Sequence, residues 1–292
     1  MYESNIDLDA VTAIDTHVHI EADDCGHAAL PQPLLDAADA YFQRTGPSPT
    51  IDQIADYYRE LSMAAVVFTV DSETNMKTPP NSSAEIARGA ARNNDVLIPF
   101  ASVDPLQGEK AVHKARSLVE DFGVRGFKFH PSTQGFAPND EEFLPLFTQL
   151  EAYGLPVVFH TGQTGIGAGM PGGFGIRLSL SNPMFLDDLA ARHPYLPIIM
   201  AHPSVPWQDE AIAIATHKAN VWIDLSGWSP KYFEPKLIQA ARTYLQDKVL
   251  FASDYPAIKP ERWMRDYAGL GLPDEVSQKI FKTNAARLLK LV

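Results

Sequence analysis

The sequence predicts an α/β protein, and within that class a (β/α)8 TIM barrel that forms a single domain over residues 1–292. The length of 292 residues suits this fold, because barrels of about 250 residues form one unit. Eight short apolar runs alternate with helix-like stretches, which is the element order of a parallel α/β fold. An open doubly wound sheet would also alternate, but no Gly-x-Gly-x-x-Gly turn follows the first strand.

The apolar runs are rich in Val, Ile and Phe, and their nearly continuous apolar character is typical of strands covered on both faces. Strands are expected at residues 12–20, 64–70, 98–103, 126–130, 156–160, 197–202, 221–225 and 249–253. Helices are expected at residues 51–61, 83–93, 108–122, 140–153, 183–192, 209–218, 235–246 and 279–290. Asn81-Ser82-Ser83 followed by Glu85, and Asn182 before Pro183, are typical helix starts.

Two loops stand out between these elements. Residues 21–50 are predicted to be an insertion after the first strand, a lid or rim excursion and not a second domain. The Gly-rich stretch 161–175 lacks the Lys-Ser/Thr of a phosphate-binding P-loop, so it is interpreted as a mobile loop over the site.

The net charge of −12 and the absence of a basic run argue against a nucleic-acid partner. The single cysteine, Cys25, excludes an internal disulfide and is interpreted as an ordinary loop thiol. The acidic N-terminal stretch has no apolar core typical of a signal peptide, and the longest apolar runs are too short to cross a membrane. A cytoplasmic protein that binds neither membrane nor nucleic acid is therefore expected.

Candidate metal ligands begin with His17 and His19, which end the first predicted strand. Residues two apart in a strand point to the same face, so both imidazoles can reach one cation. One such pair is weak evidence, but other predicted strands also end in polar groups, namely Lys128, His130, His160, His202 and Asp254. Strand ends of a barrel meet at one mouth, where such groups are costly unless they are paired or bind metal.

These strings resemble the amidohydrolase superfamily, and more narrowly the amidohydrolase-related family 2, which includes aminocarboxymuconate-semialdehyde decarboxylase. The resemblance runs nearly end to end. It is carried by IDTHVH (14–19), GFKFHP (126–131), FHTG (159–162), MAHP (200–203), WQDEA (207–211), FASDYP (251–256) and NAARL (284–288).

The resemblance implies one divalent metal ion, most often Zn²⁺, with Mn²⁺ or Fe²⁺ as alternatives. The implied ligands are His17, His19, His160 and Asp254, and His202 would be the acid/base or orienting residue. A cation held by three neutral imidazoles and one carboxylate keeps a net positive charge. It can lower the pKa of bound water toward ~7.

Further polar residues leave alternatives open. Lys128 could be the carboxylated bridging lysine of two-metal relatives, but binding a substrate carboxylate or carbonyl is favoured. His130 could touch substrate or bond to backbone, and Arg177 could clamp a carboxylate or be a solvated surface residue. Asp104 could orient a ligand histidine or serve the turn before Pro105, and Asp224 could line the pocket or cap the next segment. Asp15 is expected on the face opposite His17 with a structural role.

The expected activity is that of a metal-dependent hydrolase acting on a small carbonyl substrate: a lactone, ester, amide or β-ketoacyl thioester, in a setting such as aromatic-acid breakdown. The alternative is a nonoxidative decarboxylase of an unsaturated or aromatic acid; a hydratase or a barrel that only binds a ligand are further hypotheses. A homodimer is expected only by analogy with the family.

Overall fold

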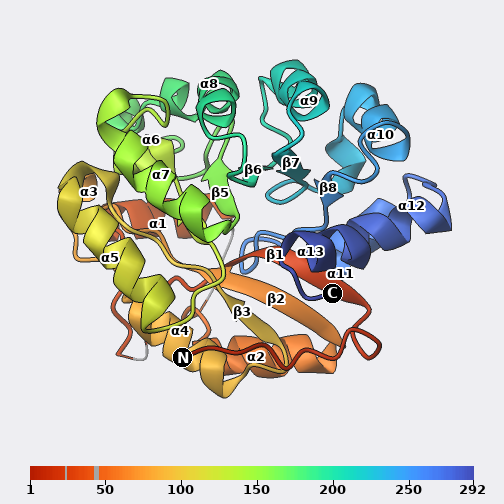
Figure 1. Cartoon of the computed structure of the whole chain (residues 1–292), viewed down its shortest axis with the longest axis horizontal. Helices are drawn as coiled ribbons and strands as arrows, with labels where there is room; N and C mark the ends of the chain where they lie inside the picture. The colour runs from red at the N-terminus through yellow and green to blue at the C-terminus, as the bar shows by residue number, and fades with distance from the viewer. Residues whose placement is uncertain (24, 43–45) are drawn as a thin grey trace.

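The computed structural model describes residues 1–23, 25–42 and 46–292. Parallel strands lie at its centre and helices surround them (Figure 1). Their order along the chain is β1 (Ala13–His19), β2 (Met63–Phe68), β3 (Leu97–Pro99), β4 (Phe127–Phe129), β5 (Val157–His160), β6 (Ile198–Ala201), β7 (Val221–Asp224) and β8 (Val249–Leu250).

The strands form two parallel ladders, β1-β2-β3 and β4 to β8, and single bridges join the ladders on both sides. Between β3 and β4, Ala101 bridges Phe127; between β1 and the segment after β8, Val18 bridges Tyr255. The described strands therefore close on themselves, and the predicted (β/α)8 barrel is confirmed.

The main helices follow the predicted order. Their bounds are α1 (Gln32–Phe42), α2 (Ile51–Glu60), α3 (Glu73–Met76), α4 (Ser83–Arg92), α5 (Glu109–Glu120), α6 (Pro131–Gln134), α7 (Leu144–Tyr153), α8 (Met184–Arg192), α9 (Gln208–His217), α10 (Pro235–Arg242), α11 (Pro260–Ala268), α12 (Asp274–Gln278) and α13 (Asn284–Leu288). Short helical turns lie at Pro105–Gln107, Glu141–Phe143, Pro171–Gly175, Leu178–Ser181, Pro230–Tyr232 and Lys279–Thr283. Within the described ranges, no helix combines the length and apolar composition needed to span a membrane.

The helix starts confirm the capping argument. The Ser82 hydroxyl accepts a hydrogen bond from the Glu85 amide at the start of α4, and Asn182 accepts one from the Met184 amide at the start of α8. Helix α1, inside the predicted insertion, and helices α3, α6, α11 and α12 were not predicted.

A bulge in β1 decides which side chains enter the barrel. Pairing with β2 shifts between Asp15 and Val18, so the regular alternation of faces is broken there. Ile14 packs inside the barrel with Val66 and Ile98, whereas Asp15 points outward and accepts a hydrogen bond from the Tyr58 hydroxyl of α2. The bulge thus separates Asp15 from His17, although they are two residues apart.

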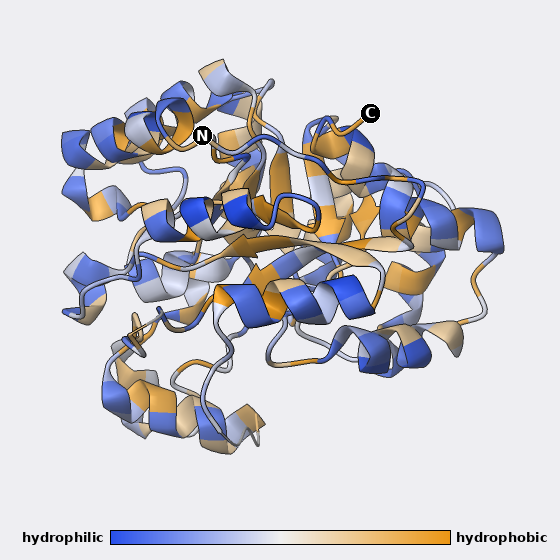
Figure 2. Ribbon diagram, turned by 90° about the horizontal axis from the view of Figure 1, so that it is seen from below, coloured by the Kyte–Doolittle hydropathy of each residue, from blue (hydrophilic) through white to orange (hydrophobic). Residues whose placement is uncertain are grey.

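The core has two parts, one on each face of the strands. One cluster fills the barrel interior and ends at α13, and a larger one lies between the strands and the outer helices. Figure 2 shows the hydrophobic residues concentrated on the central strands, while the outer helices carry hydrophilic residues on their exposed sides. The barrel floor is therefore apolar, and polar groups gather at the carboxyl ends of the strands.

Candidate metal centre and active site

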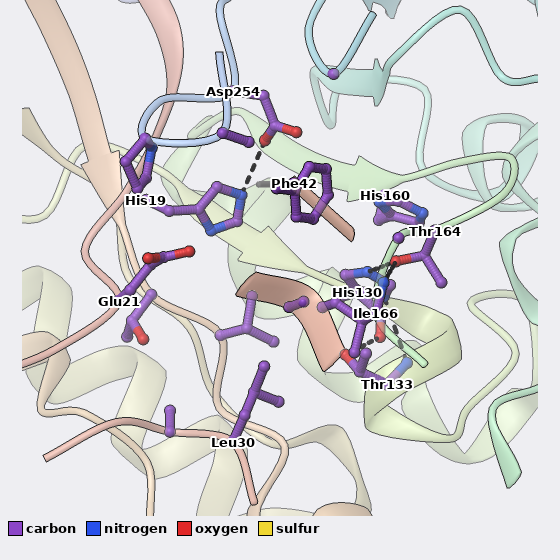
Figure 3. A pocket seen from close by; sticks show the side chains of 18 of the residues that line it. His19, Glu21, Leu30, Phe42, His130, Thr133, His160, Thr164, Ile166 and Asp254 are labelled. Atoms are coloured by element: carbon purple, nitrogen blue, oxygen red, sulfur yellow. Dashed lines mark hydrogen bonds and ion pairs between the residues drawn. The ribbon is translucent and has the colours of Figure 1, made fainter. Parts of the chain in front are cut away.

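A pocket of about 260 Å³ lies where the strands end (Figure 3). Its lining includes six of the predicted site residues: His19, Lys128, His130, His160, His202 and Asp254. The rest of the lining comes from Ile20 and the 21–50 excursion after β1, from the loop after β5, and from the segments after β2, β4, β7 and β8. The convergence that the sequence predicted thus occurs in one cavity.

Three ligand atoms from the two ends of the chain meet in this region. His17 Nε2 lies 3.2 Å from His19 Nε2, and Asp254 Oδ1 lies 3.3 Å from His17 Nε2 and 3.2 Å from His19 Nε2. Ligands at about 2.0–2.1 Å from a tetrahedral cation stand about 3.4 Å from one another. Among the described residues, His17, His19 and Asp254 form the group that could hold a metal ion.

His17 presents the correct nitrogen for a metal because Asp224 holds the other one. His17 Nδ1 lies 2.9 Å from Asp224 Oδ2, so Nδ1 carries the proton and donates, and Nε2 keeps its lone pair. Burial, followed by the charge of Lys128, lowers the pKa of His17 to about 3, which keeps the ring neutral. Burial alone would raise the pKa of Asp224, but His17 and the hydrogen bonds to the carboxylate hold it well below its usual range.

A hydrogen-bond chain runs from Asp224 to His160. The Ser226 hydroxyl donates to Asp224, and its oxygen lies 2.8 Å from His202 Nδ1, which therefore donates to it. His202 Nε2 is then the acceptor for His160 Nδ1, 2.9 Å away. This assignment leaves His160 Nε2 unprotonated, and that atom is buried without a hydrogen-bond partner.

His160 itself lies outside the group of three ligand atoms. Its ring stacks on His130, with centroids 3.8 Å apart and planes at 6°, and it lies edge-on to His202. Burial and the neighbouring His130 hold the pKa of His160 well below its usual value. The ring is thus neutral with one free lone pair, but its place as the fourth ligand stays a prediction.

A family model for amidohydrolases matches residues 14–291. The chain belongs to the amidohydrolase family. This match confirms the resemblance inferred from the strand-end motifs. No curated protein sequence matches the chain significantly.

Solved structures share the fold of this amidohydrolase. An uncharacterized TIM-barrel protein from Bordetella bronchiseptica has a TM-score of 0.78 and 22% identity, over 95% of this chain and 98% of that one. A 5-carboxyvanillate decarboxylase from Novosphingobium aromaticivorans, complexed with manganese and a nitrobenzoic acid, has a TM-score of 0.67 and 15% identity, over 96% of each chain. A probable 2-pyrone-4,6-dicarboxylic acid hydrolase from Acinetobacter baumannii has a TM-score of 0.63 and 15% identity, over 96% and 100%.

The donor set of this amidohydrolase fits a divalent cation. Two imidazole nitrogens and one carboxylate oxygen are spaced like a face of a tetrahedron. His160 Nε2 is an orphaned buried acceptor near the same cavity. Nitrogen and carboxylate donors suit Zn²⁺, Mn²⁺ and Fe²⁺ alike, so the set selects no one metal.

Lys128 and His130 are buried polar residues that line the pocket. Lys128 is fully buried, with Nζ 3.0 Å from His17 Nε2, and burial lowers the pKa of its ammonium group to about 8. His130 Nδ1 accepts a hydrogen bond from the Thr133 amide at the start of α6, 3.3 Å away, which is the backbone role expected as one alternative. The same ring lines the pocket, so contact with substrate is still open.

The remaining polar candidates, Arg177, Asp104 and Asp224, have different roles in the structure. Arg177 is exposed and does not line the pocket, so of its two alternatives the structure favours the solvated surface residue. Asp104 accepts hydrogen bonds from the Leu106 and Thr74 amides, so it serves the turn before α5 and orients no histidine. Asp224 does not line the pocket, but it accepts from the Ser226 amide, which is the capping role expected as one alternative, and it also holds His17 and the His202 amide.

Ser226 was not predicted as part of the site. The signal lies in its spacing, because a serine two residues after a strand-end aspartate can donate back to that carboxylate. In this fold its hydroxyl donates to Asp224 and accepts from His202 Nδ1, so it links the two side chains.

Replacing Asp224 with Asn is expected to weaken binding of Zn²⁺ by about 10- to 100-fold, because the amide cannot accept from all the donors around it. Competition with a chromophoric chelator measures the affinity. Asp209→Asn, on the exposed face of α9, serves as the matched control and is expected to bind like the wild type. Equal affinities for both variants would contradict the role given to Asp224.

Asp15 joins the strands that carry the ligands. Its carboxylate accepts from the Tyr58 hydroxyl at 2.7 Å, the Ser253 hydroxyl at 2.5 Å, the Ser253 amide at 2.9 Å and the His17 amide at 3.2 Å. It thereby holds the backbone beside Asp254 against β1. Burial raises the pKa of Asp15 to about 6, partly offset by these hydrogen bonds.

Asp15→Asn is expected to lower the free energy of unfolding by about 1–3 kcal/mol at pH 7.5, because an amide group would face donors. In the wild type, the folded state binds the Asp15 proton more tightly than the unfolded state. Its contribution to stability therefore increases as the pH falls from about 6 toward the unfolded pKa near 4. Urea unfolding at pH 7.5 and 5 should show a larger gap between the two proteins at pH 5; a constant gap would contradict this assignment.

Proposed function

We propose that this amidohydrolase is a metal-dependent hydrolase that uses a metal-activated water on a small carbonyl substrate: a lactone, ester, amide or β-ketoacyl thioester. The observation that carries the proposal is the meeting of His17, His19 and Asp254 within 3.2–3.3 Å at the pocket. These three residues would hold one divalent cation, with His160 as a fourth ligand. When bound, the cation supplies Lewis acidity and lowers the pKa of water toward ~7.

The proton transfers fall to Asp254 and His202. Asp254 directs Oδ1 to both imidazoles, which leaves its other oxygen to accept a proton inside the pocket. His202 lines the same pocket, and burial lowers the pKa of its ring. Its unprotonated Nε2, which accepts from His160 Nδ1, is the atom that would take up and return a proton. Both groups are within one cavity, so a proton removed from the nucleophile can be given to the leaving group.

Lys128 is proposed as the receptor for a substrate carboxylate or carbonyl oxygen. Its ammonium group lies beside His17 and lines the pocket, and no described carboxylate lies within ion-pair distance of it. A buried cation of this kind gains most from a bound anion, because water does not screen the interaction.

The second candidate function is nonoxidative decarboxylation of an unsaturated or aromatic acid. It is favoured by the buried ammonium of Lys128 and by the fold shared with a manganese-bound 5-carboxyvanillate decarboxylase. The shared fold alone does not choose, since a hydrolase also shares it.

One experiment separates the two activities. The protein, loaded with Zn²⁺ or Mn²⁺, is incubated in H₂¹⁸O with panels of lactones, thioesters and aromatic acids. Hydrolysis places ¹⁸O in the product, whereas decarboxylation releases CO₂ without consuming water. Loss of either signal in Asp254→Asn ties it to this site. A protein that binds no stoichiometric metal would overturn both candidates.

A further inference from the structure

The pocket has two chemically different sides. The metal-ligand candidates, Lys128 and the histidines occupy the strand ends. The excursion after β1 supplies Glu21 at its start and then mainly apolar side chains to the same cavity, namely Ala29, Leu30, Leu35, Ala38, Tyr41 and Phe42. Figure 3 shows Leu30, Phe42 and Ile166 in one lining with His19, His160 and Asp254. A ligand bound at the polar side must therefore place its remaining atoms against an apolar wall.

The end of α1 rests on the loop after β5. A Cβ atom at Gly165 would lie 2.5 Å from Phe42 Cζ, 2.9 Å from Phe42 Cε2 and 3.1 Å from Tyr41 Cε1. The two rings also meet each other edge to face, with centroids 5.0 Å apart. The space that a side chain would need at Gly165 is thus filled by aromatic carbon.

Backbone conformation does not explain the glycine at this position. Gly162, Gly167 and Gly169 have positive φ, where side chains are strained, but Gly165 does not. What Gly165 provides is the close approach of Phe42. This contact fixes where the aromatic wall stands relative to the polar side.

Because the cavity is small, the position of the aromatic wall determines how much room a ligand has. A volume of about 260 Å³ is below the usual range of about 300–1,000 Å³ for pockets that hold drug-sized ligands. A displacement of the Phe42 ring would change the room left for the apolar part of a ligand. In such a pocket each additional methylene group affects affinity strongly.

We propose that Phe42, seated on Gly165, is the specificity-determining residue of this site, which limits its ligands to a compact apolar body attached to the polar reacting group. The proposal rests on the proposed function for the polar end only. The apolar end follows from the contact between α1 and the β5 loop.

The test measures binding by calorimetry to the Zn²⁺-loaded protein. One ligand series is benzoate with 4-methyl, 4-propyl and 4-butyl substituents, and a parallel series has the matching neutral benzyl alcohols. The wild type is expected to bind the butyl member about tenfold or more weakly than the methyl member. Phe42→Ala is expected to remove that difference, and Phe174→Ala, an exposed phenylalanine outside the pocket lining, is expected to keep it.

Gly165→Ala supplies the second readout. It is expected to weaken binding several-fold in the wild type, because the new methyl group displaces Phe42, and by less than twofold when combined with Phe42→Ala. An equal effect in both backgrounds, a size profile unchanged by Phe42→Ala, or binding of neither series would overturn the proposal.

The two series distinguish this proposal from the proposed function. If only the neutral series binds and shows the Phe42-dependent size profile, the wall is as proposed and the carboxylate receptor is wrong. If the benzoates bind with a profile indifferent to Phe42, the wall is wrong and the proposed function stands.

Discussion

Replacing Asp254 with Asn is expected to lower turnover by about 10³-fold or more, about 4 kcal/mol in the barrier, and to remove the bound cation. Asp254 Oδ1 faces both His17 and His19, so among these three ligands it would supply the negative charge to a bound cation. Those imidazoles and the bonds to the carboxylate hold the pKa of Asp254 far below its usual range, although burial alone would raise it. The carboxylate is therefore ionised at neutral pH and available as a ligand.

Asparagine suits the backbone conformation at position 254. Asp254 has φ of 70°, in the left-handed region, which asparagine tolerates as well as aspartate does. Metal content by mass spectrometry and steady-state turnover are the measurements, and Asp274→Asn, exposed at the start of α12, is the control. Full metal occupancy with unimpaired turnover in Asp254→Asn would refute the metal centre.

His202→Asn is expected to lower kcat by about 10²- to 10⁴-fold while the metal content stays unchanged. His202 lines the pocket and lies next to the proposed ligand His160, with its Nε2 2.9 Å from His160 Nδ1. Loss of this ring removes the group that accepts and returns a proton. It removes none of the three ligand atoms, which belong to His17, His19 and Asp254.

The choice of asparagine again follows from the backbone. His202 has φ of 73°, so an alanine at this position would add strain that asparagine avoids. The pH profile separates a proton-transfer role from a merely structural one, because the limb that reports the His202 pKa should disappear. A variant that loses the metal, or keeps that limb of the profile, would assign His202 to positioning alone.

The barrel could be predicted because each of its strands is a short apolar run followed by a polar group. The bounds were less predictable at β8, which is only Val249–Leu250 although a strand is expected over 249–253 and the apolar run continues to residue 252. The residues beyond it still extend along β1, with the Thr16 amide donating to the Phe251 carbonyl and the Asp254 amide to the His17 carbonyl. Pairing with the first strand, which is distant in sequence, has no local signal.

The site was predictable to the extent that strand ends share one mouth. The spacing of His17 and His19 indicates a shared face, but the bulge that turns Asp15 away from them leaves no pattern in the residues themselves. Arg177 follows a Gly-rich loop, and only the three-dimensional path of that loop places it at the surface. Likewise, α1 lies in a stretch with few helix signals, and its aromatic end is understood only through Gly165.

The two halves of the candidate metal centre lie on either side of the seam at which the barrel closes. His17 and His19 belong to β1, whereas Asp254 follows β8 and is held there by the His17 carbonyl. During synthesis on the ribosome, the ligand atoms cannot meet until the chain up to residue 254 has emerged. Capture of the cation is therefore expected to be a late event in maturation, and it would report that the seam has formed.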